Sequence, residues 1–244
     1  MRRAFVSDIH ANLEALEAVL EDIGKQAVDE IICLGDIVGY GAEPNECMEI
    51  IRKRSAIVLL GNHDAASVKL LDTNLFNNFA QAAIDWTVQI LQKAHCTYLL
   101  SLPLTATREP FTFVHATPYE PGRWYYITSL EEASFNFRHF GTEVCLVGHT
   151  HIPMIVVLDE GKKVYARQAG HINLRETPGA RFLINVGSVG QPRDRIAKSC
   201  YGIFDDATGE FFFRRVAYDI PKTQTRMRKA NLPEFLITRL TDGI

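Results

Sequence analysis

The chain has 244 residues, of which 47% are hydrophobic and 23% charged, an ordinary globular composition. Its formal net charge is −3, so it lacks the overall positive charge that draws proteins to duplex nucleic acid. No apolar run approaches the roughly 18 residues of a membrane span, and "MRRAFVSDIH" lacks the apolar centre of a secretory signal. We therefore expect neither duplex nucleic acid nor a membrane as partner.

The five cysteines are odd in number and include no C-x-x-C pair. Cys33 and Cys145 lie in apolar, strand-like segments, where a reduced thiol packs as a small hydrophobe. This usage predicts a reducing compartment, most simply the cytoplasm. The sequence shows no repeat, low-complexity tract or linker, so we expect residues 1–244 to form one domain with a helical tail at 221–244 packed on it.

The first quarter of the chain alternates between apolar runs and helical periodicity. Strands are predicted at 3–8, 29–36 and 55–64, and helices at 12–27, where Asn12 is the N-cap, and at 44–54. A β-α-β-α-β order of near-continuous apolar strands indicates parallel pairing and an α/β fold.

The remainder of the chain changes in character after residue 151. Residues 65–98 are mostly helical in pattern, strands are predicted at 110–116 and 143–151, and a helix at about 129–139. Residues 154–167, 181–188 and 200–216 are β-rich with turns at Glu160-Gly161 and Thr208-Gly209, and one helix runs from Pro221 to near Gly243.

The tail admits two interpretations. Its apolar positions recur at near-helical spacing and are interleaved with basic residues, namely Met227, Leu232, Leu236 and Leu240 with Lys222, Arg226, Arg228 and Lys229. We favour a helix that packs its apolar stripe on the core. The alternative is a basic face that recruits polyanionic substrates by electrostatic steering.

Polar side chains follow each of five predicted strands. They are Asp8 and His10, then Asp36, then Asn62, His63 and Asp64, then His115, and finally His149 and His151. Ligands bind at the carboxyl ends of parallel strands, and residues two apart on extended backbone point the same way, so these side chains should converge. The other three histidines, His95, His139 and His171, are interpreted as structural or surface residues.

These side chains offer oxygen and imidazole nitrogen but no thiolate. That donor set suits Mn, which we favour, or Fe, Zn, Ni or Co. Seven candidate ligands are too many for one ion, which suggests two divalent cations about 3.5–4 Å apart. Two such cations repel each other, so a bridging carboxylate is expected, and Asp36 is the natural choice.

The motifs D-x-H (8–10), G-D (35–36), G-N-H-D (61–64), His115 and G-H-T-H (148–151) resemble those of the calcineurin-like metallophosphoesterases in order and spacing. The later "NVGSVGQPRD" (185–194) resembles the small bacterial and archaeal phosphodiesterase branch. The resemblance implies a four-layer α-β-β-α sandwich of two mixed β-sheets, with the metal site at the carboxyl ends of strands.

The resemblance also implies individual roles. One metal would take Asp8, His10 and His151, the other Asn62, His115 and His149, with Asp36 between them. A hydroxide bridging the metals would attack phosphorus, and His63 would be the general acid for the leaving oxygen or a clamp on phosphate. Asp64 would fix the tautomer of His63 or cap a helix.

The substrate is less well defined than the site. We expect a small phosphate ester, with phosphodiesters or nucleotide phosphoanhydrides favoured, and name Asn12, Tyr40 and Arg193 as candidate contacts, although Arg193 also fits a salt-bridged surface residue. "GRWYYI" (122–127) either stacks on a nucleobase or, as we favour, packs on the core.

Three alternatives remain open: a phosphomonoesterase, a protein phosphatase, and a protein-binding scaffold of the same fold. The family's Ser/Thr phosphatases carry an arginine soon after G-D and end the third motif in G-N-H-E, whereas this chain has "GDIVGYG" and "GNHD". A scaffold would be expected to lack ligands, and this chain keeps them all. A homo-oligomer is left open.

Overall fold

The computed structural model describes the backbone of residues 1–244 and every side chain except that of Leu75. Two six-stranded sheets form its centre, in the orders β3-β2-β1-β11-β12-β9 and β4-β5-β6-β10-β7-β8. The strands are β1 (Arg2–Val6), β2 (Glu30–Cys33), β3 (Ser55–Val58), β4 (Thr105–Arg108), β5 (Phe111–Val114), β6 (Val144–Val147), β7 (Met154–Leu158), β8 (Val164–Arg167), β9 (His171–Asn173), β10 (Arg181–Asn185), β11 (Ser199–Asp205) and β12 (Glu210–Val216).

Each sheet combines parallel and antiparallel pairs. In the first sheet β1, β2 and β3 pair in parallel, whereas the pairs β1–β11, β11–β12 and β12–β9 are antiparallel. In the second sheet β5–β6 and β6–β10 are parallel pairs, and β4–β5, β10–β7 and β7–β8 are antiparallel pairs. Five strands that the sequence placed at one rim therefore belong to two sheets.

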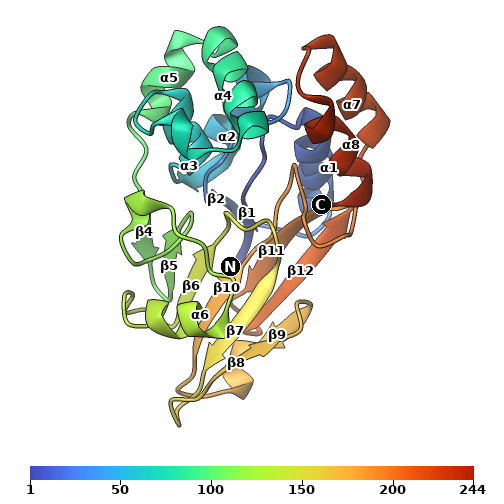
Figure 1. The fold of residues 1–244 in the computed structure, drawn as a ribbon. Coiled ribbons are helices and arrows are strands. Elements are labelled where there is room, and N and C mark those ends of the chain that lie inside the picture. Colours follow the sequence, from blue (N-terminus) through green and yellow to red (C-terminus); the bar gives the residue numbers. More distant parts are fainter.

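Helices cover the outer faces and one end of the sheets. They are α1 (Leu13–Gly24), α2 (Pro44–Arg54), α3 (Asn62–Ser67), α4 (Asn78–Ile90), α5 (Lys93–Leu99), α6 (Leu130–Asn136), α7 (Ile220–Lys229) and α8 (Glu234–Asp242), with short 3-10 turns η1 (Thr73–Leu75), η2 (Pro121–Arg123) and η3 (Leu174–Glu176). The helices α3, α4, α5, α7 and α8 gather above the sheets in Figure 1, although α7 and α8 come from the other end of the chain.

Alternate residues of the strands face different apolar layers, as the pleat requires. In β1, Ala4 and Val6 pack with Leu16 of α1, whereas Phe5 lies between the sheets, 5.5 Å from Phe111 by ring centroids. The second sheet turns its other face to α6, where Ala133 packs on Cys145, Val147 and Leu183. The layers are therefore α-β-β-α, and the predicted sandwich is confirmed.

Several predicted elements end a few residues early in the structure, and three differences are larger. The strand predicted at 55–64 ends at Val58, and residues 62–64 instead open helix α3. The short edge strands β4 and β9 were missed because their exposed positions carry little apolar alternation. The single tail helix is in fact two, because Asn231 takes a left-handed φ of 54° and Pro233 cannot continue a helix.

The apolar stripe of the tail is buried. Met227, Leu236 and Leu240 pack in one cluster with Tyr40 and Ala83, so α7 and α8 cover the loop after β2 and the side of α4. The basic residues between them pair with carboxylates: Lys222 and Arg226 with Glu14, Arg226 also with Glu43, and Arg228 with Glu234. Three of the four basic side chains are thus engaged within the protein, against the steering interpretation.

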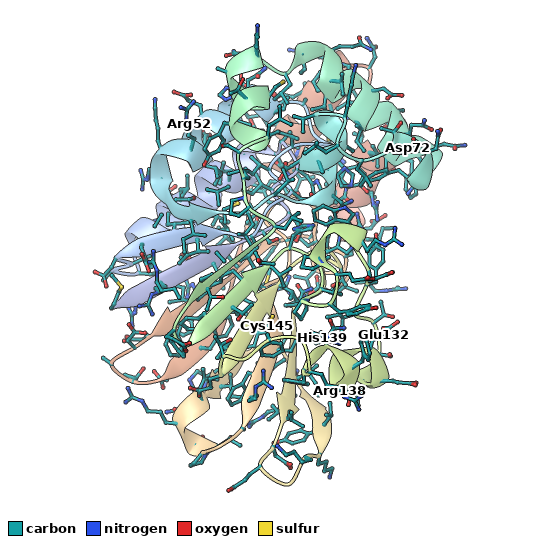
Figure 2. The ribbon with its side chains drawn as sticks, turned by 90° about the vertical axis from the view of Figure 1, so that its left-hand side faces the viewer. Arg52, Asp72, Glu132, Arg138, His139 and Cys145 are labelled. Atoms are coloured by element: carbon teal, nitrogen blue, oxygen red, sulfur yellow. The ribbon has the colours of Figure 1, made fainter. Side chains whose placement is uncertain are left out.

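All five cysteines are free thiols, and all but Cys96 are buried. Cys145 lies within β6, and Figure 2 labels it among the strands of the lower half. Within the described residues, no helix combines the length and the apolar character that crossing a bilayer demands.

We predict that Leu236→Ala lowers the free energy of unfolding by about 2–5 kcal/mol, because it opens a cavity under α8. Leu236 is 1% exposed in the cluster that joins α4, α7 and α8. Thr238→Ala is the control, since Thr238 is exposed on the same helix and should change stability by less than about 0.5 kcal/mol. Urea denaturation of both variants measures the difference, and equal stabilities would contradict the packing assignment.

Candidate metal centre

The turns that follow the strands hold an unusual backbone conformation. Asp8, His10, Asp36, His149 and His151 all have left-handed φ, between 51° and 68°. The expectation that pairs two residues apart converge on extended backbone is therefore wrong, although the side chains do converge. Left-handed backbone at a non-glycine residue costs roughly 1–3 kcal/mol, and such residues persist where the surrounding structure over-determines them.

Two glycines leave room for the carboxylates of the site. A Cβ at Gly61 would lie 2.1 Å from Oδ1 of Asp36, and one at Gly148 would lie 2.5 Å from Oδ2 of Asp8. Any side chain at either position would collide with a carboxylate. The glycines of the G-N-H-D and G-H-T-H motifs are therefore explained by close approach to Asp36 and Asp8.

The seven predicted ligands come together at the junction of the two sheets. Nε2 of His151 lies 3.3 Å from Oδ1 of Asp8 and 3.1 Å from Nε2 of His10. Nε2 of His115 lies 3.3 Å from Oδ2 of Asp36 and 3.2 Å from Oδ1 of Asn62. Two potential metal-holding groups are Asp8, His10, His151 and Asp36, His115, His149, each with ligand atoms within 4.8 Å of one another.

Asp36 lies between these two groups. Its Oδ2 is 3.7 Å from Nε2 of His10 on one side and 3.3 Å from Nε2 of His115 on the other. Its Oδ1 accepts a hydrogen bond from the main-chain N–H of His63, which fixes the carboxylate plane. Asp36, His10 and His63 form a third potential metal-holding group, so the side chain of His63 borders the centre.

Main-chain carbonyls set the tautomers of three histidines. Nδ1 of His10, His115 and His151 donates to the carbonyls of Val38, Leu34 and Gln191, at 3.2, 3.0 and 2.6 Å. A carbonyl only accepts, so in each neutral imidazole the proton is on Nδ1 and the Nε2 lone pair faces the centre. The lone pairs of His10 and His151 then oppose each other at 3.1 Å, an arrangement that a cation between them would relieve.

His149 is turned the other way round. Its Nε2 donates to the carbonyl of Trp124 at 3.0 Å, and its Nδ1 is buried without a hydrogen-bond partner among the described residues. A buried, unpartnered acceptor is costly, and a cation would satisfy it. Together with the carboxylates, these inward lone pairs fit divalent cations held by nitrogen and oxygen.

Burial dominates the electrostatics of the centre. It raises the pKa of Asp8 to about 7 and lowers that of His149 to about 3, which leaves the imidazole neutral as a metal ligand must be. Burial also opposes a proton on His115, but the negative charge of Asp36 prevails and raises the pKa to about 9. Burial would raise the pKa of Asp36 too, yet the imidazoles around it, His115 first, hold it below its usual range. Without a cation, His115 is thus the group that carries a proton beside Asp36, and a bound metal would take the place of that proton.

His63 stands at the start of α3, beside the ligands. Its ring lies 4.8 Å from that of His10, 4.3 Å from that of Tyr40 and 5.0 Å from that of Phe76. Its Nδ1 is buried and has no partner within the described part of the chain. Burial lowers the pKa of His63 to about 4, so the free imidazole is neutral and a nearby anion would raise its pKa.

Asp64 caps a helix and supports a loop. Its Oδ1 accepts from the N–H groups of Ile37 and Val38, at 2.9 and 3.1 Å, and its Oδ2 accepts from Gly61 at 3.1 Å. The bond from Gly61 corresponds to the capping interpretation, and the other two hold the loop after β2. A role in fixing the tautomer of His63 has no hydrogen bond to support it in the described structure.

A cavity of about 680 Å³ lies beside the centre, and His63, Asn62 and His149 form part of its wall. Of the candidate substrate contacts, Tyr40 and Arg193 line this cavity. Asn12 does not line it, because its amide donates to Gly190 and its Oδ1 accepts from Ala15 and Thr223. Asn12 is therefore a cap and a structural link.

The sequence reasoning missed the residues that act through their main chain. The carbonyls of Leu34, Val38, Trp124 and Gln191 orient four histidines, yet a carbonyl leaves no signal in residue type. Trp124 also packs its ring 5.9 Å from that of His115, and Tyr126 stacks on His149 at 4.1 Å, so "GRWYYI" packs against the centre.

The three remaining histidines are placed outside the centre. His95 is buried in α5, and His171 of β9 forms an exposed contact with Glu210 at 3.2 Å. His139 packs against Tyr119 and Phe135, each 4.7 Å away by ring centroids.

A two-sheet sandwich with buried Asp, His and Asn at the sheet ends defines a metallophosphoesterase fold. The family model described as the calcineurin-like phosphoesterase superfamily domain matches residues 1–209, so the chain belongs to this superfamily of metal-dependent hydrolases. The resemblance stated from the motifs is confirmed.

Three comparisons place the chain among known proteins. The uncharacterized protein MJ0912 of Methanocaldococcus jannaschii is 41% identical over 245 residues, covering 98% of this chain and 97% of the relative. The crystal structure of a metallophosphoesterase from Sphaerobacter thermophilus is 42% identical, with a TM-score of 0.88 and 100% of both chains covered. A symmetrical bis(5'-nucleosyl)-tetraphosphatase of Actinobacillus pleuropneumoniae is 34% identical over 67 residues, 26% of this chain and 25% of the relative.

We predict that Asp36→Asn lowers the metal content of both groups together, from about two ions per chain to fewer than about one. A neutral amide is a weaker ligand and no longer offsets the repulsion of neighbouring cations. Elemental analysis after loading with Mn²⁺ and desalting measures the content. Asp85→Asn is the control, since Asp85 is exposed on α4. Full metal content in Asp36→Asn would refute the shared position.

Proposed function

We propose that the protein hydrolyses phosphodiester or nucleotide phosphoanhydride bonds with the help of two divalent cations, Mn²⁺ being favoured. One observation carries this proposal: buried carboxylates and inward histidine lone pairs converge at the wall of a cavity that also holds His63. Asp8, His10 and His151 would hold one cation, Asn62, His115 and His149 the other, and Asp36 both.

When bound, such cations lower the pKa of coordinated water and neutralise charge on a phosphoryl group. The chain's own contribution is positioning. Carbonyls fix the rings, Asp36 is held by the N–H of His63, and the burial of the centre excludes bulk water from the ligands. No serine or cysteine nucleophile is needed in this scheme.

His63 is assigned the proton transfer to the leaving oxygen. Its Nδ1 has no hydrogen-bond partner among the described residues. The ring lines the cavity and lies beside the two metal-holding groups. A negatively charged phosphoryl group next to the ring would raise the pKa from its low value, which favours the protonated form a general acid requires. Tyr40 packs against both His63 and His10 and lines the same wall.

The cavity of about 680 Å³ has the size of a site for a small organic ligand, which supports a small substrate. Its lining combines arginines with aromatic rings, a combination suited to a phosphate group attached to a flat organic group. The partial similarity to a bis(5'-nucleosyl)-tetraphosphatase supports a nucleotide anhydride. We also propose that residues 1–244 form one domain and that the protein, with its free thiols, is cytoplasmic.

A turnover panel with added Mn²⁺ tests the function. It compares a phosphomonoester, a phosphodiester, cyclic nucleotides, dinucleoside polyphosphates and a phosphopeptide. Preferential turnover of diesters or dinucleoside polyphosphates is the expected result. A preference for the monoester or the phosphopeptide would support the phosphatase alternative, and no turnover of any compound would favour a scaffold.

We predict that His63→Ala lowers turnover of a substrate with a poor leaving group by about 10²–10⁴-fold, because no group then protonates the departing oxygen. The loss should be smaller for a nitrophenyl leaving group, which departs without a proton. Metal content, measured by elemental analysis, should stay at the wild-type level.

His139→Ala is the matched control, because His139 is exposed and packs against Tyr119 and Phe135. Its turnover should match the wild type. Equal losses in His63→Ala for good and poor leaving groups would assign His63 to phosphate binding instead of acid catalysis.

A further inference from the structure

The side chains that line the cavity beside His63 carry positive charge and include no acidic residue. Three arginines contribute to its wall: Arg123 from η2, Arg193 from the loop after β10, and Arg239 from α8. Among the described lining residues there is no aspartate or glutamate. An anionic ligand is therefore expected to extend beyond the metal centre into this cavity.

Two of these guanidiniums are held on aromatic rings. Cζ of Arg193 lies 5.7 Å from the ring centroid of Tyr40, and Cζ of Arg239 lies 5.2 Å from that of Phe235. Phe235 in turn stacks on Phe79 of α4 at 4.7 Å. Stacking of this kind fixes the plane of a guanidinium while leaving its N–H edge able to donate.

The described hydrogen-bond partners of these two arginines are oxygens other than side-chain carboxylates. Arg193 donates from Nε and Nη2 to the amide oxygen of Gln191, and from Nη2 to the hydroxyl of Tyr40 at 3.4 Å. Arg239 donates from Nε to an oxygen of Ile244, the last residue of the structure, and the described bonds leave its two terminal nitrogens without a partner. By contrast, Arg226 and Arg228 on the neighbouring helix pair with glutamates.

Arg239 keeps its charge at neutral pH although Arg193 lies near it. Burial, with the like charge of Arg193, lowers the pKa of Arg239 to about 10, which still leaves the guanidinium protonated. Two like charges in a partly buried space repel, and an anion placed between them would convert that repulsion into attraction.

We infer that Arg193 and Arg239 form a subsite for a second phosphate of the substrate, adjacent to the scissile phosphate at the metal centre. Guanidiniums bind phosphate through paired N–H donors, so the subsite favours substrates with two or more linked phosphates over simple diesters. This inference rests on the proposed function and narrows it to phosphoanhydrides.

The subsite gives the tail a second role. Residues 234–242 lie beyond the 1–209 segment that matches the superfamily, yet α8 supplies both Arg239 and Phe235 to the cavity. Its buried face, with Leu236, Ile237 and Leu240, anchors the helix and so positions the arginine. Packing and substrate selection are then carried by different faces of one helix.

Equilibrium binding tests the subsite without turnover. Calorimetry on the protein without added metal, with inorganic tripolyphosphate as the probe and orthophosphate as the comparison, should show tighter binding of tripolyphosphate. Arg239→Gln and Arg193→Gln should each weaken tripolyphosphate binding by about 10-fold or more, as expected for a lost charge-assisted hydrogen bond. Arg228→Gln is the control, because it removes the same charge from an exposed side chain of α7 that pairs with Glu234. This variant should bind tripolyphosphate like the wild type.

Kinetics with Mn²⁺ provides the second measurement. Arg239→Gln should lower kcat/KM for a dinucleoside polyphosphate by about 10- to 100-fold and for bis(p-nitrophenyl) phosphate by less than about 3-fold, since the latter has no second phosphate. Arg239→Lys should retain part of the activity on the polyphosphate. Melting temperatures show whether each variant is folded. If Arg239→Gln does not fold, the same comparison of the two substrates is made with Arg193→Gln.

The outcomes separate the subsite from the proposed function. Undetectable tripolyphosphate binding by the wild type, equal binding by all variants, or equal kinetic losses on both substrates would overturn the subsite. Failure of the metal-loaded wild type to hydrolyse any phosphate ester would instead overturn the proposed function. The subsite would then still be tested by the tripolyphosphate binding measurements, which need no turnover.

Discussion

The structure depends on one electrostatic constraint: two carboxylates and several imidazole lone pairs are buried together at the junction of two sheets. His10 and His151 oppose their Nε2 atoms at 3.1 Å, and Asp8 and Asp36 are almost fully buried beside them. Such a cluster is unfavourable without a cation, and it is maintained by features that cannot easily relax. Left-handed turns, closely approaching glycines and main-chain carbonyls restrict the ligand side chains to these positions. The packing of the surrounding sandwich therefore offsets the free energy that this arrangement costs before a cation binds.

Much of the fold and most of the ligand set were predictable because both follow from residue type. Apolar runs marked β1, β2, β5 and β6, and the polar residues after them identified the site. The backbone conformation was not predictable, because the extended geometry assumed for Asp8 and His10 is replaced by left-handed turns that no simple pattern announces. The carbonyls that orient the histidines were invisible for the same reason, since any residue can supply one.

The role of the tail illustrates a different limit. Periodicity identified Leu236 and Leu240 as an inward stripe, and both are buried. The break between α7 and α8 arises at Asn231 and Pro233, and it redirects the second helix so that Arg239 reaches the cavity. Which charged residue of a helix meets a distant cavity depends on tertiary placement. Sequence spacing therefore separated the buried face from the polar one, but it did not distinguish Arg239 from the arginines that pair with glutamates.

The side chain of Asn12 joins three parts of the chain that are remote in sequence. It caps α1, donates to the carbonyl of Gly190, and accepts from the hydroxyl of Thr223 in α7. Gly190 directly precedes Gln191, whose carbonyl orients His151. The beginning of the chain, its final helices and one ligand of the centre are thus mechanically coupled through a single amide. A disturbance at the far end of the polypeptide, such as an appended sequence that shifts α7, would be transmitted to the orientation of an imidazole without touching the site itself.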